Sequence, residues 1–354
     1  MQRARVRVLL DSLSKSATVA SNIGQAGRGA KIASPATAWP NEGPPLSDAR
    51  HRPMSAVLLP DPGPRLHWTR PSPALAHVVW GYASRQPGEG RPRSARPQAI
   101  DFPANVVSSL VVIHAGSLHA AGDAGPVPRC AISGARTLPS TLLFGADLDS
   151  TTVVFRPGLG LPLLRLPADA FVDRFVDASL ALSGSPWDRL FDEMAATTDT
   201  RERVRLLEQA LLSNLLALPR DTRRIAVGIR DGFARLSGMT VDRLAWEFGV
   251  TSRTLQRRTI ECFGVSPKPL LRIARMHAAV NALSRATRRT SADALARSID
   301  SLAGLAIDCG FADQSHLGRE LRSMTGRSPL ELRTELLGEA DWLQKRIWHD
   351  LLDL

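Results

Sequence analysis

The sequence predicts an α+β protein with a β-rich region in its first half and an all-helical region in its last third. Between about residues 66 and 155, short apolar runs alternate with Gly and Pro turns, which is typical of strands. After about residue 221, apolar residues recur at spacings of three and four, which indicates amphipathic helices. Two segments of the helical region repeat each other, so we expect the same helical unit twice.

The β-rich region is expected to span residues 66–218 and to end in helices. Its strand-like runs are 77–80, 106–114, 141–144 and 152–155. Helices are predicted over 166–182, with Pro167 in the first turn, and over 201–218. In the second of these, Val204, Leu207, Leu211 and Leu215 keep one apolar face at helical spacing.

The two ends of the chain lack such patterns. Residues 1–60 are rich in Pro, Gly, Ser, Ala and Arg, and we expect a disordered basic tail. The first twenty residues superficially resemble a transit peptide, and Met54 is an alternative translation start. Residues 338–354 form either a small docking helix or a frayed tail.

Charge and cysteine content restrict the partners and the compartment. The net charge is +11, and residues 221–337 carry 19 Lys+Arg against 12 Asp+Glu, so most of the excess lies in the helical region. Such a balance favours polyanionic partners. The three cysteines, Cys130, Cys262 and Cys309, have neither disulfide-framework nor zinc-site spacing, which suggests a reducing cytoplasm. No run of about 18 apolar residues exists, so no membrane span is expected.

The repeat has the form of a helix-turn-helix unit. Leu244-Ala245-x-x-x-Gly249 recurs as Leu305-Ala306-x-x-x-Gly310, and each copy is followed by a Leu, an Arg two residues later and Gly-x-Ser-Pro. Thr240 is expected to cap the first helix of the first copy, and Thr251 or Ser252 the second. Asp313 is expected to cap the second helix of the second copy. Two short helices crossing through a glycine turn are typical of DNA-binding proteins.

Polar residues occupy the outward face of the second helix in each copy. Arg can pair with guanine O6 and N7, and Gln with adenine N6 and N7, so these side chains suit the major groove. The alternative for each is a solvated helix face. The outward residues are Arg253, Thr254, Gln256, Arg257 and Arg258 in the first copy and Gln314, Ser315, Gly318 and Arg319 in the second.

These residues resemble the AraC/XylS transcriptional regulators over about 225–333. The most specific stretch is Gly310-Phe-Ala-Asp-Gln-Ser-His-Leu-x-Arg319, followed by Gly326-x-Ser-Pro329. The resemblance implies a DNA-binding domain over 221–337, with two helix-turn-helix subdomains joined by a long helix near 267–284. It also implies that both recognition helices enter successive major grooves, about 34 Å apart. The candidate base contacts implied by the resemblance are Arg253, Gln256, Arg257, Gln314, Ser315 and Arg319.

The implied function is sequence-specific binding of double-stranded promoter DNA by a cytoplasmic transcription regulator, as monomer or homodimer. RNA polymerase and a small-molecule effector are candidate partners; neither a cofactor nor a metal is expected. Phosphate contacts are expected from an Arg-rich surface. Its members are Arg223, Arg224, Arg258, Arg272, Arg275 and Arg327.

The β-rich region resembles, more loosely, the N-terminal region of one AraC-like subgroup, which implies a cupin-like sensing or dimerising domain. The best marks are Val154-Phe-Arg-Pro-Gly158 and the helix over 201–218. A metal cupin needs His and Glu on neighbouring strands. His114 and His119 are present without a Glu at a useful spacing, so a metal site is not expected.

The sequence disfavours an enzyme and a repair regulator, and it leaves a protein-interaction module open. An enzyme is not expected, because Ser183-Gly-Ser-Pro186 is no nucleophile elbow and Gly158-Leu-Gly160 is no phosphate loop. A repair regulator of the Ada type needs clustered cysteines, whereas Cys130 stands alone. A protein-interaction module with a degenerate helix-turn-helix fold stays open. Thr259 and Leu321 replace the family's usual Phe, and Gly318 offers no side chain to a base.

Overall fold

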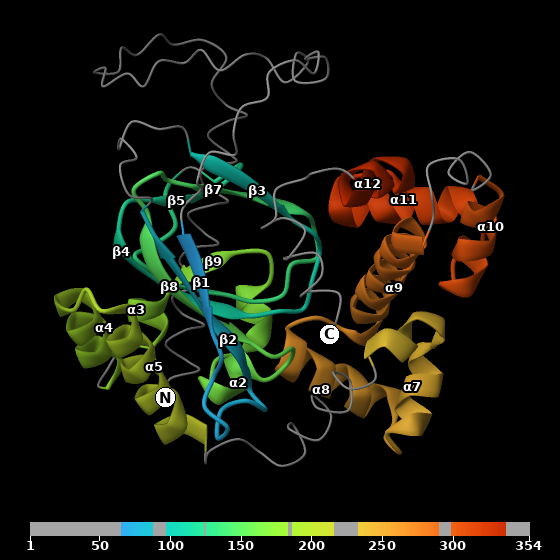
Figure 1. Cartoon of the computed structure of the whole chain (residues 1–354). Helices are drawn as coiled ribbons and strands as arrows, with labels where there is room; N and C mark the ends of the chain where they lie inside the picture. Colours follow the sequence, from blue (N-terminus) through green and yellow to red (C-terminus); the bar gives the residue numbers. More distant parts are fainter. Residues whose placement is uncertain are drawn as a thin grey trace, which may run out of the picture. The chain divides into compact units, whose positions relative to one another are not determined.

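Two antiparallel sheets form the first half of the described chain, and helices form the second (Figure 1). The computed structural model describes residues 65–87, 97–123, 125–182, 186–215, 233–289 and 299–337. The predicted tail (1–60) and C-terminal segment (338–354) lie outside these ranges, as do residues 216–232, where we expected the domain boundary. That division of the chain therefore stays a prediction. The predicted α+β fold class is confirmed.

Nine strands are described in this part of the chain, divided between a six-stranded and a three-stranded sheet. The larger sheet has the order β1-β2-β8-β4-β6-β9 and the smaller the order β3-β7-β5, and every pairing is antiparallel. The strands are β1 (Arg65–Thr69), β2 (Val79–Gln86), β3 (Gln98–Phe102), β4 (Ser109–Ala115), β5 (Leu118–Ala120), β6 (Cys130–Ser133), β7 (Ser140–Phe144), β8 (Asp149–Phe155) and β9 (Phe175–Asp177).

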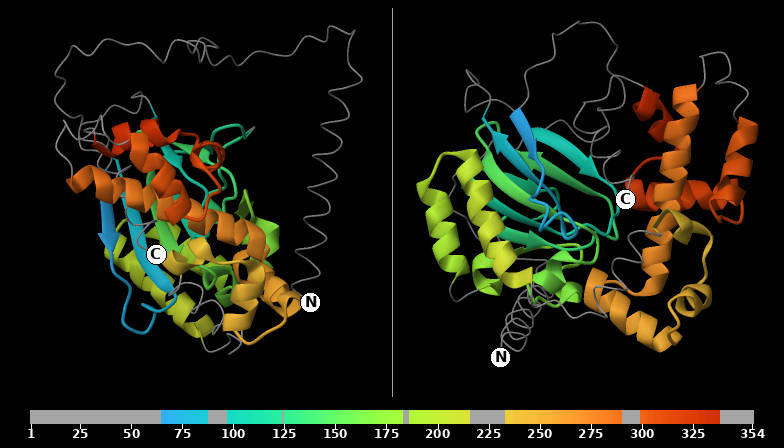
Figure 2. Two further views of the ribbon diagram at one scale, coloured as in Figure 1. Left: turned by 90° about the vertical axis from the view of Figure 1, so that its right-hand side faces the viewer. Right: turned by 60° about the horizontal axis from the view of Figure 1, so that its bottom comes forward.

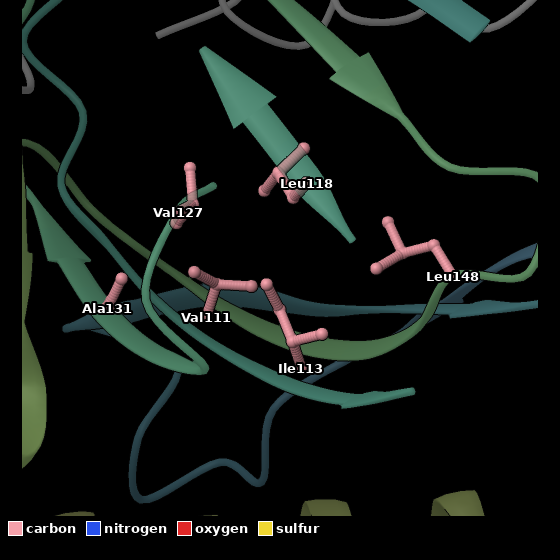
Figure 3. Packing of buried hydrophobic residues seen from close by; sticks show 6 residues of the cluster. All are labelled: Val111, Ile113, Leu118, Val127, Ala131 and Leu148. Atoms are coloured by element: carbon pink, nitrogen blue, oxygen red, sulfur yellow. The ribbon is translucent and has the colours of Figure 1, made fainter. Parts of the chain in front are cut away.

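The two sheets share an apolar core, as expected of a cupin-like domain. Val111 and Ile113 on β4 point toward Leu118 on β5, and Leu142 of β7 packs against the same cluster (Figure 3). Alternation along β4 sends Leu110 and Val112 to the opposite face. Strand β4 therefore has one face toward the small sheet and one toward other elements.

Helices α4 (Trp187–Ala196) and α5 (Thr200–Leu215) lie beside each other along the large sheet (Figures 1 and 2). On the face turned toward them, the hydroxyl of the fully buried Tyr82 donates to Glu208 Oε1 of α5 at 3.2 Å. Burial, with the carboxylate of Glu208, raises the pKa of Tyr82. The helix predicted over 201–218 is confirmed as far as residue 215, where α5 ends, and residues 216–218 lie outside the described ranges.

A buried ion pair ties α5 to β8. Arg203, 3 % exposed, donates from Nη1 to both oxygens of Asp149 at 2.9 and 3.0 Å, and from Nε to Thr197 O. Removing one partner of such a pair leaves the other charge buried. We expect Arg203→Ala to lower the free energy of unfolding by about 3 kcal/mol in urea denaturation. Arg205→Ala, which breaks an exposed pair on the same helix, should change it little. Equal losses would contradict a structural role for Arg203.

The helix predicted over 166–182 is wrong. The segment forms a short 3₁₀ helix, η2 (Ala168–Phe171), then β9, then α3 (Ala178–Ala181). Val172, whose backbone is extended, ends the 3₁₀ helix, Asp173 takes a positive φ of 57°, and residues 175–177 pair with β6 as the last strand of the large sheet. Sheet pairing thus prevails over a helical spacing of apolar residues. Before it, α2 (Gly160–Leu163) follows β8, and α4 was not predicted.

The remaining elements are helical. They are η3 (Phe233–Gly238), α7 (Val241–Glu247), α8 (Ser252–Phe263), α9 (Pro267–Arg289), α10 (Ile299–Asp308), α11 (Gln314–Thr325) and α12 (Pro329–Leu337). The long helix α9 lies between the pair α7–α8 and the helices α10–α12 (Figure 1) and contacts each of them. It extends beyond the expected end near residue 284. Within the described residues, no helix has the length and apolar character needed to cross a membrane.

Candidate nucleic-acid interface

The first helix-turn-helix unit consists of α7 and α8. Thr240 Oγ1 accepts the amide hydrogen of Arg243, and Thr251 Oγ1 accepts that of Thr254, so each helix begins at the threonine expected to cap it. Between them, Gly249 has a φ of +64°, a conformation that glycine adopts without a steric cost. Leu244 and Leu255 are buried between the helices.

The second unit, α10 and α11, has the same construction. Gly310 has a φ of +79°, and Asp313 Oδ1 accepts the amide hydrogen of His316 at 2.7 Å. Leu317, Leu321 and Met324 form the buried face of α11. Asp313 follows Gly310 by three residues, whereas Thr251 follows Gly249 by two, so the turn of this copy is one residue longer. The extra residue lies before the cap.

The turns of the two units repeat each other bond for bond. Val250 N donates to Ala245 O at 3.0 Å, and Phe311 N donates to Ala306 O at 2.8 Å. One residue earlier, Gly249 and Gly310 donate to the carbonyls of Trp246 and Ile307, both at 3.0 Å. The sequence repeat is therefore a repeat of backbone structure, not only of composition.

All six candidate base contacts are exposed. Arg253, Gln256 and Arg257 lie on the outer face of α8, and Gln314, Ser315 and Arg319 on that of α11. Arg257 is 61 % exposed, and its nearest carboxylate, Glu261, is 3.9 Å away. None of these side chains is needed for packing between the helices, so each is accessible to a ligand.

The four described candidates for phosphate contacts already have partners within the chain. Arg258 pairs with Glu261, and Arg275 donates to Gly310 O at 3.3 Å. Arg272 forms two 2.9 Å bonds to Glu320, which join α9 to α11, and Arg327 pairs with Asp101 and Glu335. Their role toward phosphate stays a prediction; Arg223 and Arg224 lie outside the described residues.

The Arg272–Glu320 pair has an electrostatic consequence. The hydrogen bonds from Arg272 lower the pKa of Glu320, so this carboxylate stays ionised at neutral pH. Because the partners are 48 residues apart and belong to different helices, no local spacing could have indicated the pair. It fixes the second unit on the connecting helix.

Three positions depart from the AraC/XylS sequence pattern, and they are Thr259, Leu321 and Gly318. Thr259 and Leu321 are fully buried, and the Thr259 hydroxyl donates to Gln256 O at 3.0 Å. Gly318 has open space around it, since a Cβ there would meet nothing within 4 Å. The smaller residues thus close both inner faces, and Gly318 leaves a bare patch on α11.

Two exposed apolar residues were missed in the sequence. Trp246 and Ile307 occupy equivalent positions of α7 and α10, and each is 70 % exposed. Arg243 Cζ lies 4.3 Å from the centroid of the Trp246 ring. The spacing of the sequence repeat makes these two positions equivalent, but it does not predict that either side chain is exposed.

Two of the described cysteines and one described histidine have strongly shifted pKa values. Burial raises the pKa of Cys262 to about 12 and, together with Asp177, that of Cys130 to about 11, so both thiols stay protonated. Burial lowers the pKa of His114 to about 4, and its Nε2 bonds to Thr151 Oγ1. Among the described residues, no three His, Cys, Asp or Glu side chains are placed to share a metal ion.

A protein-family model matches the helix-turn-helix region of this chain. Residues 244–335 match the family model described as a helix-turn-helix domain. Among curated proteins, no significant relative was found.

Solved structures of ToxT from Vibrio cholerae are similar to this chain at a low level. An apo form carrying one substitution has 12 % identity and a TM-score of 0.35, and covers 68 % of this chain and 94 % of its own. The unsaturated fatty acid-bound wild type has 13 % identity and a TM-score of 0.33, over 71 % and 99 %. ToxT from strain O395 has 10 % identity and a TM-score of 0.32, over 69 % and 98 %. Scores this low do not by themselves establish a common fold.

The identity of the C-terminal region rests on the family match and on the duplicated turn geometry together. The match begins at Leu244, in the first unit, and ends in α12, so it includes both units and the helix between them. The motifs that resemble AraC/XylS regulators lie on those same elements. The C-terminal region of this chain is thus a tandem helix-turn-helix domain, and its motifs resemble those of the AraC/XylS family.

Proposed function

We propose that this protein is a sequence-specific, double-stranded DNA-binding transcription regulator whose helices α8 and α11 enter successive major grooves. The observation that carries the proposal is the duplication itself. Two units with the same turn bonds, each with a side-chain cap at the start of its second helix, present exposed Arg and Gln side chains on the outer face of that helix. A packing module has no need for a matched polar face.

The side chains suit hydrogen bonding to base edges. Arg253 and Arg257 would donate in pairs to guanine, and Gln256 would pair with adenine. On α11, Gln314, Ser315 and Arg319 would do the same for the second half-site, with Gly318 making no base contact. The DNA site is therefore bipartite, with the more strongly specified half under α8.

The connecting helix would set the distance between the half-sites. Helix α9 contacts α7, α8, α10 and α11, and the Arg272–Glu320 pair fixes α11 on it. Helices held in this way would address DNA one turn apart, about 34 Å. Lys268 and the partly exposed Arg272 and Arg275 would add phosphate attraction and salt dependence.

A second function is favoured by the two exposed apolar side chains. Trp246 and Ile307 would suit contact with another protein, such as RNA polymerase or a second copy of the chain. Such contacts fit a module that keeps the fold with weak or nonspecific DNA binding. Homodimerisation and a cytoplasmic location also stay predictions.

Selection of bound DNA from a random library with the full-length chain separates the two functions. We expect an enriched motif with two half-sites about one helical turn apart, and an affinity for it that falls steeply with salt. Retention of random DNA without a motif would mean charge-driven binding only. No retention would leave protein interaction as the function.

A further inference from the structure

Helices α8 and α11 both contact the β-rich region near their C-terminal ends. Helix α8 contacts α2 and η2. Near the end of α11, Met324 O accepts a hydrogen bond of 2.8 Å from Ala104 N, two residues after β3. The candidate base contacts lie on these two helices, so whatever holds the helix ends also affects the distance between the two half-sites on DNA.

The contact at the end of α8 is too close for any side chain at its last position. Gly264 ends the helix with a φ of +77°, and a Cβ there would lie 2.5 Å from Ala168 O and 2.7 Å from Val172 Cγ2. The residue before it, Phe263, is buried, and its Cζ lies 2.6 Å from where a Cβ of Gly158 would be. Glycine on both sides therefore lets α8 pack directly on the β-rich region.

The second unit shows that this crowding is not a property of the helix cap. Gly326 ends α11 at the equivalent position with a φ of +72°, and a Cβ there would meet nothing within 4 Å. The two caps are otherwise alike, since Gly264 N donates to Ile260 O at 2.9 Å and Gly326 N donates to Arg322 O at 3.0 Å. The crowding of Gly264 therefore belongs to its contact with the β-rich region.

The contact at the end of α11 consists of buried hydrogen bonds and an ion pair. Besides its bond to Met324, Ala104 accepts at its carbonyl from His277 Nε2 of α9 at 3.1 Å, and all three residues are buried. Just beyond α11, Arg327 pairs with Asp101 of β3 at 2.6 Å. Leaving a buried polar group without its partner is costly, so this segment holds both α9 and α11.

A path of backbone hydrogen bonds joins the two contacts through residues 134–136. Arg136 exchanges two such bonds, both of 2.8 Å, with Asn105, the residue after the one that bonds α11. At the other end, Gly134 N donates at 3.0 Å to Phe171 O of η2, the element that contacts α8. Each step of the path is either the chain itself or a backbone hydrogen bond of ordinary length, so the ends of α8 and α11 are held at a fixed distance.

We propose that residues 101–105, 134–136 and 168–173 form a brace that fixes the separation of α8 and α11 and thereby sets the half-site spacing that the protein accepts. Helix α9 is one connection between the two units, and a second connection restricts rotation about the first. Gly264 touches no base in this arrangement and acts through α8, so it is a positioning residue. The role in spacing rests on the proposed function; the fixed separation of the helices does not.

Pulsed electron paramagnetic resonance on the full-length protein without DNA tests the brace. Spin labels are placed at the exposed positions of Gln256→Cys on α8 and Ser323→Cys on α11, with the half-buried Cys130 replaced by Ser. We expect a narrow distance distribution in this parent. Gly264→Ala should make it at least about twofold wider, because a Cβ at this position and φ does not fit beside η2.

Matched variants separate loss of the brace from damage to the helix cap. Gly326→Ala introduces the same backbone strain without the contact and should leave the distribution narrow. Val172→Glu places a carboxylate at the contact from the β-rich side, leaves the cap of α8 intact, and should widen the distribution as Gly264→Ala does. Leu138→Glu, at a 61 % exposed position of the same region, is its control.

Two results would overturn the brace. One is a distribution that stays narrow in Val172→Glu, with folding verified by circular dichroism; this variant decides the question even where Gly264→Ala does not fold. The other is equal widening by Gly326→Ala and Gly264→Ala, which would assign the effect to strain in the cap.

DNA sites of altered spacing test the consequence for recognition. With one base pair inserted between the half-sites, the parent should lose at least about tenfold in affinity, comparable to a mismatched base pair. Val172→Glu should lose less than about threefold relative to its own affinity for the selected site. Equal losses in both proteins would refute the role in spacing. A narrow distance distribution that widens in Val172→Glu, in a protein that selects no DNA site, would refute the proposed function and leave the brace.

Discussion

We expect the double variant Arg257→Ala/Arg319→Ala to lose sequence-specific DNA binding, by about 2–6 kcal/mol relative to the parent protein. Each arginine would donate two hydrogen bonds to one guanine, and such a pair contributes about 1–3 kcal/mol of discrimination. The two residues lie on different helices, α8 and α11, so their losses should add. Fluorescence anisotropy on the selected site and on a scrambled site measures both affinities.

Each single variant should relax one base position, in the half-site that its helix contacts. Arg189→Ala removes an exposed arginine from α4, in the β-rich region, and serves as the charge-matched control. It should leave both affinities nearly unchanged. If Arg257→Ala and Arg319→Ala weaken the selected and the scrambled site equally, the two arginines contact phosphate only.

The second large effect is expected from the core of the second unit. Leu317 is fully buried between α10 and α11, and Leu317→Ala should lower the free energy of unfolding by about 2–5 kcal/mol. Leu255, at the equivalent position of the first unit, is also fully buried, and Leu255→Ala should cost a similar amount. Urea denaturation followed by far-ultraviolet circular dichroism measures both.

The control for these variants is a leucine of the same region without a core contact. Leu330, on α12, is 66 % exposed, so Leu330→Ala should change the free energy of unfolding by less than about 0.5 kcal/mol. The affinity for DNA should be lower in the two core variants and unchanged in the control. A stable Leu317→Ala protein with intact specific binding would show that α11 does not need the helix-turn-helix core.

The helix-turn-helix units could be predicted from sequence because their determinants are local. Capping by Thr240, Thr251 and Asp313 depends on side chains within three residues of the amides they accept. The turns need glycine at 249 and 310, and the buried leucines follow the helical period. Each of these signals lies within one short segment. Because the segment is repeated, the signals occur twice.

The β-rich region was predicted less completely, because strand pairing depends on residues far away in the chain. The short strands β5 and β9 have three residues each, too few for a recognisable alternation, and are defined by their partners β7 and β6. The helix expected over 166–182 failed for this reason. Contacts such as Arg327–Asp101, 226 residues apart, leave no trace in any local spacing.

The cavity of about 550 Å³ between the two sheets, whose wall includes Arg136, also could not be predicted from the sequence. Arg136 follows a strand in a segment with no distinctive motif, and only the packing of the two sheets places it at the cavity wall. The exposed faces of α8 and α11 could be predicted because exposure follows from the helical period once the buried side is known. Whether those faces contact bases is measured with the Arg257→Ala and Arg319→Ala variants.

The most direct test of the account is the affinity of the full-length protein for its selected site with about five base pairs inserted between the half-sites. This insertion turns one half-site to the opposite side of the duplex, about half a helical turn away. Because α9 holds the two units together, we predict that binding falls to the level of a site with one half scrambled. Unchanged affinity for the lengthened site would contradict a bipartite contact by α8 and α11.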